Sequence, residues 1–271
     1  MKRYALFGAG TLCALIFDLL RACPHLEQLP KPPSEALALF DDNPALWGMQ
    51  KFGITVRPPA EIDASAFDAF IICSSNAADR IAEKLVRMYH VPEAKIDLSL
   101  SEICRYLRER FVADFANGTN RQALAGAVAE CGVFTGAFAA VINRCFPGRR
   151  LWLFDTFDKP DLGACVPDVR RKLPHPEQAV FKQGLFPDTA MTDPGLQTCS
   201  FLFVNLDFNL YAPTLDGLAF FYPKLVRGGA ILVHDTLTSP DVNEAVACFC
   251  NNANVHALPA GDGFSAVIMK P

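Results

Sequence analysis

The apolar runs in the second half of the sequence end in residues that could bind a ligand or take part in chemistry. The run FLFVNL is followed by Asp207, and GGAILV is followed by the pair His234 and Asp235. Because ligands of open α/β sheets bind beyond the carboxyl ends of the strands, we expect these side chains at one edge of a sheet. Two residues after Asp207 the chain has Asn209, whose amide has no titratable proton acceptor. One carboxylate is thus delivered from the core without a second ionisable group beside it.

Glycines and acids also follow two earlier apolar runs. The first run contains Glu130 and is followed by Gly132 and, before a predicted helix, by Gly136. Glycine allows a ligand to approach the backbone closely. The second run ends at Asp155, whose carboxylate can accept hydrogen bonds from both hydroxyls of a ribose. These residues favour a nucleoside-like ligand.

A third run is followed by Gly184 and Phe186, a gap with an aromatic wall that is suited to an adenine. Taken singly, each feature has a structural explanation. An acid after a strand is more often a turn former or helix cap, and a lone histidine such as His234 is more often a hydrogen-bonded structural residue. Five successive runs that all end in polar or glycine-rich positions favour a functional site.

Strand-like and helix-like segments alternate from residue 120 to 271, which predicts a parallel α/β sheet. The predicted strands are AVAECGV, RRLWLFDT, AVFKQG, FLFVNLD and GGAILVHDT. Two further predicted strands, VHALPA and FSAVIMK, follow these. They are joined by a short turn at residues 261–263, so they must be antiparallel. A parallel sheet closed by such a hairpin resembles the layout of class I methyltransferases.

Longer segments carry a more specific resemblance. The segments AECGVFTGAFAAVINRCFPGRRLWLFDTFD, QGLFPDT, NLDFNLYAPTLDGLAFFYPKL and GGAILVHD resemble the macrocin O-methyltransferase (TylF-like) family, over about residues 112–271. The resemblance implies S-adenosylmethionine as the methyl donor and a divalent metal, usually Mg²⁺. It further implies these donor contacts: Glu130 and Gly132 at the methionine side, Asp155 at the ribose, and Gly184 and Phe186 at the adenine. Gly136, before the predicted helix, is expected to belong to the same donor site.

The same resemblance implies that Asp207, His234 and Asp235 are the metal ligands. A cation held by carboxylates can bind the acceptor hydroxyl and lower its pKa, which makes methyl transfer easier. Magnesium prefers oxygen ligands. His234 therefore either lies outside the coordination shell or favours manganese or another transition metal.

The sequence departs from the family at Asn209. The family pattern after this strand is an acid, any residue, a second acid and Leu-Tyr, with the second acid placed to act as general base. This chain has DFNLY from Asp207 onward, and Asn209 cannot accept a proton near neutral pH. Either the metal suffices, with His175 or solvent accepting the proton, or methyl transfer is lost and the domain only binds its ligand.

Residues 1–100 predict a smaller Rossmann-like unit, followed by a helical link over residues 101–119. The predicted strands are RYALFG, ALALF, ITV, AFIICSS and IDLSL, with helices over residues 11–22 and 77–89. After the GAG turn ending at Gly10, the first acid that follows the next predicted strand is Asp41, 31 residues later, which is farther than the roughly 20 typical of dinucleotide sites. The FGAG, DDNPALWG and FIICSSN segments resemble a nucleotide-sugar-binding module. A unit used only for packing or dimerisation is the alternative.

Composition excludes several classes of partner. The net charge is −4 and neither half is basic, so nucleic acid and anionic membranes are not expected as partners. The apolar stretch over residues 123–142 has Glu130 at its centre and three glycines, which disfavours a membrane span. The ten cysteines include no CxxC pair and predict free thiols in a cytoplasmic protein.

We therefore expect an α/β protein of two Rossmann-like units, the second a metal-assisted O-methyltransferase. The acceptor is expected to be a sugar-type hydroxyl on a small molecule or glycan, which rests on the family and the pairing of the two units. A ligand-binding protein that has lost catalysis and a dinucleotide-binding oxidoreductase are the alternatives. Homo-oligomerisation stays open.

Overall fold

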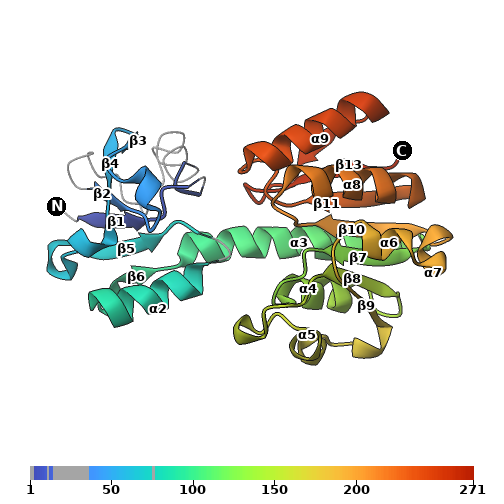
Figure 1. The fold of residues 1–271 in the computed structure, drawn as a ribbon, viewed down its shortest axis with the longest axis horizontal. Coiled ribbons are helices and arrows are strands. Elements are labelled where there is room, and N and C mark those ends of the chain that lie inside the picture. The colour runs from blue at the N-terminus through green and yellow to red at the C-terminus, as the bar shows by residue number, and fades with distance from the viewer. Residues whose placement is uncertain (1–2, 11, 15–36, 75–76) are drawn as a thin grey trace. The chain divides into compact units, whose positions relative to one another are not determined.

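The computed structural model describes residues 3–10, 12–14, 37–74 and 77–271 (Figure 1). The chain divides into two compact units, Met1–Tyr106 and Leu107–Pro271, and the division falls within helix α3 (Ser99–Arg121). Most of the helix expected over residues 11–22 lies outside the described residues. No helix in the described part of the chain is long and apolar enough to cross a membrane.

The second unit contains a seven-stranded sheet in the order β12-β13-β11-β10-β7-β8-β9. Five neighbouring strands are parallel: β7 (Ala127–Cys131), β8 (Leu151–Asp155), β9 (Ala179–Gln183), β10 (Phe201–Leu206) and β11 (Leu225–Val233). The closing strands β12 (Ala257–Pro259) and β13 (Ala266–Met269) are antiparallel. The expected parallel sheet with an antiparallel C-terminal hairpin is confirmed.

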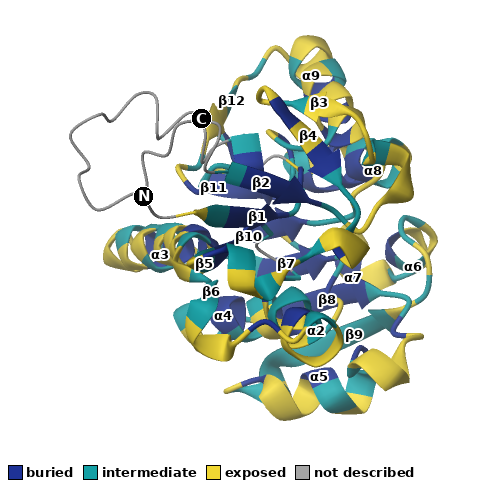
Figure 2. Ribbon diagram, turned by 90° about the vertical axis from the view of Figure 1, so that its left-hand side faces the viewer, coloured by how far each residue is buried: buried dark blue, intermediate teal, exposed yellow. Residues whose placement is uncertain are grey.

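Side chains alternate between the two faces of this sheet, as the period of a strand requires. In β8, Leu151 and Leu153 belong to one apolar core, and Trp152 and Phe154 belong to the other. The first core is covered by α3, α4 (Ala137–Cys145) and α5 (Val166–Lys172), and the second by α8 (Tyr211–Phe221) and α9 (Pro240–Ala253). The central strands β7, β8 and β10 are therefore largely buried on both sides, whereas the helices carry many exposed residues (Figure 2).

Two short helices, α6 (Asp188–Met191) and α7 (Pro194–Gln197), connect β9 to β10. Strand β7 lies between β8 and β10, so the chain winds outward in both directions from β7. In open α/β sheets, ligands bind outside the carboxyl ends of the strands at such a switch point. The topology therefore predicts a ligand site at the loops that follow β7, β8 and β10.

The first unit contains a six-stranded sheet in the order β3-β4-β2-β1-β5-β6. Its strands are β1 (Tyr4–Phe7), β2 (Leu37–Phe40), β3 (Gln50–Lys51), β4 (Ile54–Arg57), β5 (Ala69–Ile72) and β6 (Ile96–Asp97), and α2 (Ala78–Tyr89) connects β5 to β6. All are parallel except β3, which forms a hairpin with β4. The strand expected over IDLSL is only two residues long, because α3 already begins at Ser99.

Candidate active site

The register of the second sheet brings three strand ends to the same level. Leu206 of β10 pairs with Cys131 of β7 on one side and with Val233 of β11 on the other. The residues that follow are therefore neighbours: the Asp207 amide donates to the carbonyl of Cys131 at 2.8 Å. Likewise the His234 amide donates to the carbonyl of Leu206 at 2.9 Å. Local strand pairing alone thus places Asp207 and His234 side by side.

Gly132 is required at this edge by packing. It has φ +82°, and a Cβ added there would lie 2.1 Å from the carbonyl oxygen of Asp207. No other residue type fits without moving the β10 backbone. The sequence interpretation, in which this glycine admits a ligand, is therefore joined by a structural reason for the same residue.

The loops that follow four of the parallel strands contain non-glycine residues in the left-handed region. These are Phe134 (φ 50°), Phe157 (φ 51°), Asn209 (φ 60°) and Asp235 (φ 56°). Such conformations are uncommon for residues with a side chain, and they cluster at functional sites where the surrounding structure stabilises them. Their repetition along one edge of the sheet separates this edge from an ordinary set of loops.

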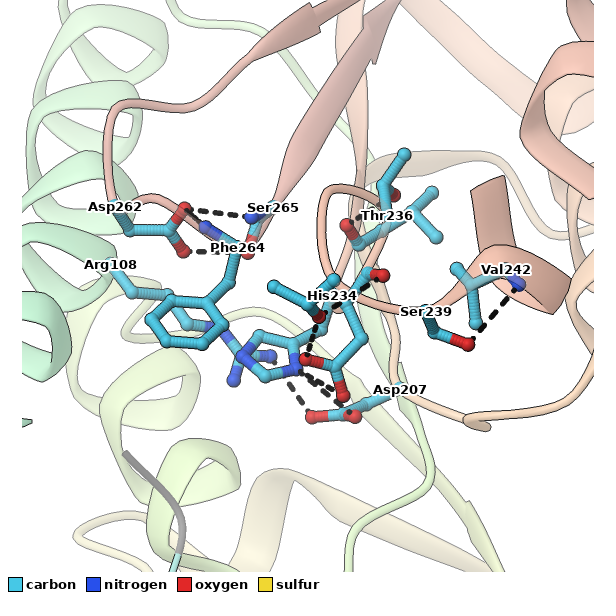
Figure 3. Close-up of polar contacts among 12 residues, drawn as sticks. Arg108, Asp207, His234, Thr236, Ser239, Val242, Asp262, Phe264 and Ser265 are labelled. Carbon is cyan, nitrogen blue, oxygen red and sulfur yellow. Dashed lines mark hydrogen bonds and ion pairs between the residues drawn. The ribbon is translucent and has the colours of Figure 1, made fainter. Parts of the chain in front are cut away.

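Asp207, His234 and Asp235 form a compact group at the ends of β10 and β11. Figure 3 shows Asp207 and His234 facing each other. One ligand atom from each lies within 4.8 Å of the other two. Nδ1 of His234 is 3.4 Å from Oδ1 of Asp207 and 3.3 Å from Oδ2 of Asp235. Nδ1 is nevertheless buried and makes no hydrogen bond to either carboxylate.

These distances are only slightly longer than those between two ligands of one metal ion. Two ligand atoms held 2.0–2.1 Å from one ion and at right angles to each other are about 3 Å apart. A buried nitrogen that faces two carboxylates without a hydrogen bond is arranged as a ligand would be. The residues therefore fit the divalent cation that the sequence resemblance implies.

Arg108 of α3 is a member of this site that the sequence interpretation missed. Its Nη2 is 3.2 Å from Oδ2 of Asp207 and 3.0 Å from Oδ1 of Asn205, and its guanidinium lies 3.9 Å from the centre of the Phe138 ring. A signal for its burial was present. Cys104, Arg108, Val112 and Ala116 recur at helical spacing, and all four are buried.

The charges in this group stabilise one another. Burial opposes ionisation of Asp207, but the neighbouring His234 and Arg108 outweigh it and lower the pKa of Asp207 to about 2. Burial likewise disfavours a charged His234. The Asp207 carboxylate overcomes that effect and the repulsion from Arg108, and raises the pKa of His234 to about 9. Without a cation the group is thus held together by alternating charges.

Asp155 organises the loop after β7. Its Oδ2 accepts hydrogen bonds from the amides of Val133 (2.7 Å) and Phe134 (2.9 Å), and its Oδ1 accepts one from Phe157 (3.0 Å). The loop then passes into α4 at Gly136, where φ is +79°. Asp155 thus shapes the expected donor loop through the backbone, and any ribose contact would be made in addition.

Glu130 lies beneath this loop and is 1% exposed. Its Oε1 accepts a hydrogen bond from Asn205 Nδ2 at 3.2 Å, and its Oε2 is buried without a partner. Burial raises the pKa of the Glu130 carboxyl well above its usual value, despite the attraction of Arg108. Since Asn205 also accepts from Arg108, one hydrogen-bond chain joins Glu130 to Asp207.

The remaining predicted site residues lie in different surroundings. Gly184 follows β9 with φ +134°, and Phe186 is half-buried and packs against Phe208 with ring centres 5.3 Å apart. Asn209 is exposed. His175 precedes β9, at the amino ends of the parallel strands, and its amide donates to Asn143 Oδ1 at 2.6 Å. The structure therefore does not bring His175 to the edge that carries Asp207.

The C-terminal hairpin contributes an aromatic residue, Phe264, to the site, and the sequence did not indicate this contact. The ring of Phe264 stacks on His234, with centres 5.9 Å apart and planes at 8° (Figure 3). Asp262 fixes the turn by accepting hydrogen bonds from the amides of Phe264 (2.9 Å) and Ser265 (2.7 Å). The hairpin thus covers one side of the imidazole.

Comparison with known proteins finds one related family and several related folds. Residues 173–262 match the family described as Macrocin-O-methyltransferase (TylF). No curated protein matches the chain. Among solved structures, the O-methyltransferase NovP is 21% identical with a TM-score of 0.52, and the match covers 60% of this chain and 79% of NovP.

Two further structures are more distant. The calicheamicin methyltransferase CalS11 is 19% identical with a TM-score of 0.47, covering 71% of this chain and 91% of CalS11. The O-methyltransferase TomG from Streptomyces achromogenes, solved in complex with S-adenosylmethionine, is 13% identical with a TM-score of 0.45, covering 73% and 91%. The family match confirms the resemblance seen in the sequence, and the likeness to NovP confirms the fold. The second unit therefore has the fold of NovP, and residues 173–262 within it resemble the TylF family.

Proposed function

We propose that the second unit transfers a methyl group from S-adenosylmethionine to a hydroxyl, with a divalent cation held by Asp207, His234 and Asp235. One observation carries the metal part of the proposal: a buried histidine nitrogen without a hydrogen bond faces two carboxylates at 3.3–3.4 Å. The TylF family match supports the reaction class. A dinucleotide-dependent oxidoreductase has no comparable support.

The donor would bind over the loop between β7 and α4. Asp155 fixes the amides of Val133 and Phe134 in this loop, and Gly136 begins the helix behind it. Glu130 and the half-buried Phe186 border the same edge. The donor supplies an electrophilic methyl group when bound, and this loop would orient it towards the acceptor at the ends of β10 and β11.

The acceptor oxygen must lose its proton as it attacks the methyl group. Asp207, His234 and Asp235 are called the acid–histidine group below. A divalent cation bound by this group would lower the pKa of a hydroxyl bound to the cation. Asn209 is exposed and adopts φ 60°, a conformation that asparagine tolerates well, but its amide accepts no proton. Solvent would therefore take the proton.

A second candidate function is ligand binding without catalysis. Asn209 favours it, because the family places an acid there to act as base. The methyltransferase proposal is preferred, since Asp207, His234 and Asp235 are arranged as metal ligands, which a pure binding role does not require.

The acceptor class, location and assembly state belong to the same proposal. We take a sugar-type hydroxyl as acceptor, on the family match and the sequence resemblance of the first unit to nucleotide-sugar-binding modules. No disulfide joins any of the nine described cysteines, which supports a reducing compartment such as the cytoplasm. The proposal also includes binding of a nucleotide sugar by the first unit and association of the chain into a homo-oligomer.

The test combines calorimetry with a transfer assay. S-adenosylmethionine and its demethylated product should bind, whereas NADH should not. Methyl transfer to a panel of sugar acceptors should stop when EDTA is added, while donor binding persists. Transfer that is fully resistant to EDTA would refute the metal role, and an absence of donor binding would refute the methyltransferase itself.

A further inference from the structure

Arg108 occupies a position on α3 where the surrounding sequence calls for an apolar residue. Its helical neighbours on the same face, Cys104, Val112 and Ala116, are buried, and Arg108 is only 8% exposed. Burying a guanidinium costs free energy that its partners must offset. Its Nε has no hydrogen-bond partner, so the offset is incomplete. A stability role alone does not account for a cation here.

The guanidinium is fixed on three sides. Nη2 contacts both Asp207 (3.2 Å) and Asn205 (3.0 Å), and the Phe138 ring lies against its face at 3.9 Å. Asn205 is in turn held by Glu130. These contacts hold the charge of Arg108 beside Asp207.

Asp207 is consequently shared. Its Oδ1 faces His234, while its Oδ2 accepts from Arg108. An ion in the group would find one of the two Asp207 oxygens already engaged. It would also meet a fixed positive charge that cancels one of the two carboxylates.

We propose that Arg108 is a positioning residue that holds Asp207 when no metal is present and weakens the affinity of the site for divalent cations. This inference rests on the proposed metal site. Two consequences follow: the ligand group stays assembled without an ion, and the ion exchanges readily. A residue that only stabilised the fold would not weaken metal binding.

Titration of the full chain with MnCl₂, followed by calorimetry, tests this inference. Arg108→Met removes the charge but keeps an apolar chain against Phe138. We expect it to lower the dissociation constant for Mn²⁺ by about tenfold or more, since a unit charge a few ångströms away acts strongly on a divalent ion. Arg108→Lys keeps the charge and should stay within about threefold of the wild type.

Arg110→Met is the matched control, because Arg110 lies on the same helix but pairs with Asp114 at the surface. It should leave the Mn²⁺ affinity unchanged. Thermal unfolding supplies a second measurement: without metal, Arg108→Met should melt below the wild type, and added Mn²⁺ should raise its melting temperature by more.

The outcomes separate this inference from the metal site itself. If folded Arg108→Met binds Mn²⁺ no more tightly than the wild type, the inference is overturned. Should that variant fail to fold, Arg108→Gln, which keeps a hydrogen-bond donor, is judged by the same criterion. If the wild type binds no more Mn²⁺ than Asp207→Ala does, the proposed metal site is wrong and the inference falls with it.

Discussion

Both units use an acid after their second strand to bind the loop after their first. In the first unit, Asp41 accepts the amide of Ala9 at 2.7 Å. In the second, Asp155 accepts the amides of Val133 and Phe134 at 2.7 and 2.9 Å. In each sheet the two strands are parallel neighbours, so the acid is delivered next to the loop. An acid at this position is therefore part of the α/β scaffold and does not by itself indicate a nucleotide ligand.

The first strand of each unit has a second parallel neighbour, and the two units differ in the residue that follows that neighbour. In the first unit this strand is β5, which is followed by Cys73, and in the second it is β10, which is followed by Asp207. Within the described residues, only the second unit assembles a group able to hold a metal. The scaffold is common to both units, and the ionisable residues added beyond β10 and β11 make the difference.

The largest effect on stability is expected at Asp207. Replacing it by alanine leaves Arg108 and His234 buried without their shared partner, which typically costs about 3–5 kcal/mol of unfolding free energy. Urea unfolding of the second unit measures this loss. Asp207→Asn, which keeps an acceptor for Arg108, should lose less. A loss below about 1 kcal/mol for alanine would show that the charged group is not coupled as described.

Asn209→Asp tests whether the edge of the second unit is short of a base. Aspartate tolerates the left-handed conformation at this exposed position, so the fold should not change. Methyl transfer to the sugar panel should accelerate by up to the roughly 10²–10⁴-fold contributed by a positioned general base. If the wild type is inactive and only this variant turns over, natural catalysis must be abandoned in favour of ligand binding.

Asp155→Ala should disorder the loop between β7 and α4, over which we propose that the donor binds. The amides of Val133, Phe134 and Phe157 lose a charged acceptor, and the affinity for the demethylated donor should fall by about 1.5–3 kcal/mol. Calorimetry measures the change. Unaltered affinity would mean that the loop keeps its shape without Asp155.

Asp41→Ala is the matched change in the first unit and should have the smallest effect. It removes the acceptor for Ala9 and Asn43, so a loss of about 1 kcal/mol in stability is expected, with donor affinity unchanged. A fall in donor affinity comparable to that of Asp155→Ala would contradict the separation of roles between the two units.

Much of this architecture follows from the sequence, because period and chain order determine it. Alternating segments predicted the parallel sheet of the second unit, and its strand ends predicted that Asp207 and His234 would be neighbours. The place of Arg108 in the site was not predicted, because Arg108 lies on a helix about 100 residues before Asp207 in the chain. Its helical spacing indicated only that it would be buried. Phe264 reaches His234 through a hairpin, a long-range contact that no local pattern reports. His175 precedes a strand, which places it at the opposite edge.

Strand β13 lies between β11 and β12, both of which precede it in the chain. While the chain is being synthesised, the edge of β11 that pairs with β13 stays unpaired until residues 266–269 have left the ribosome. Strand β12 has no partner strand until the same residues are available. Open apolar edges are where nascent chains aggregate. Phe264 cannot cover His234 before the same moment. Closure of the sheet and completion of the site therefore depend on the same short strand.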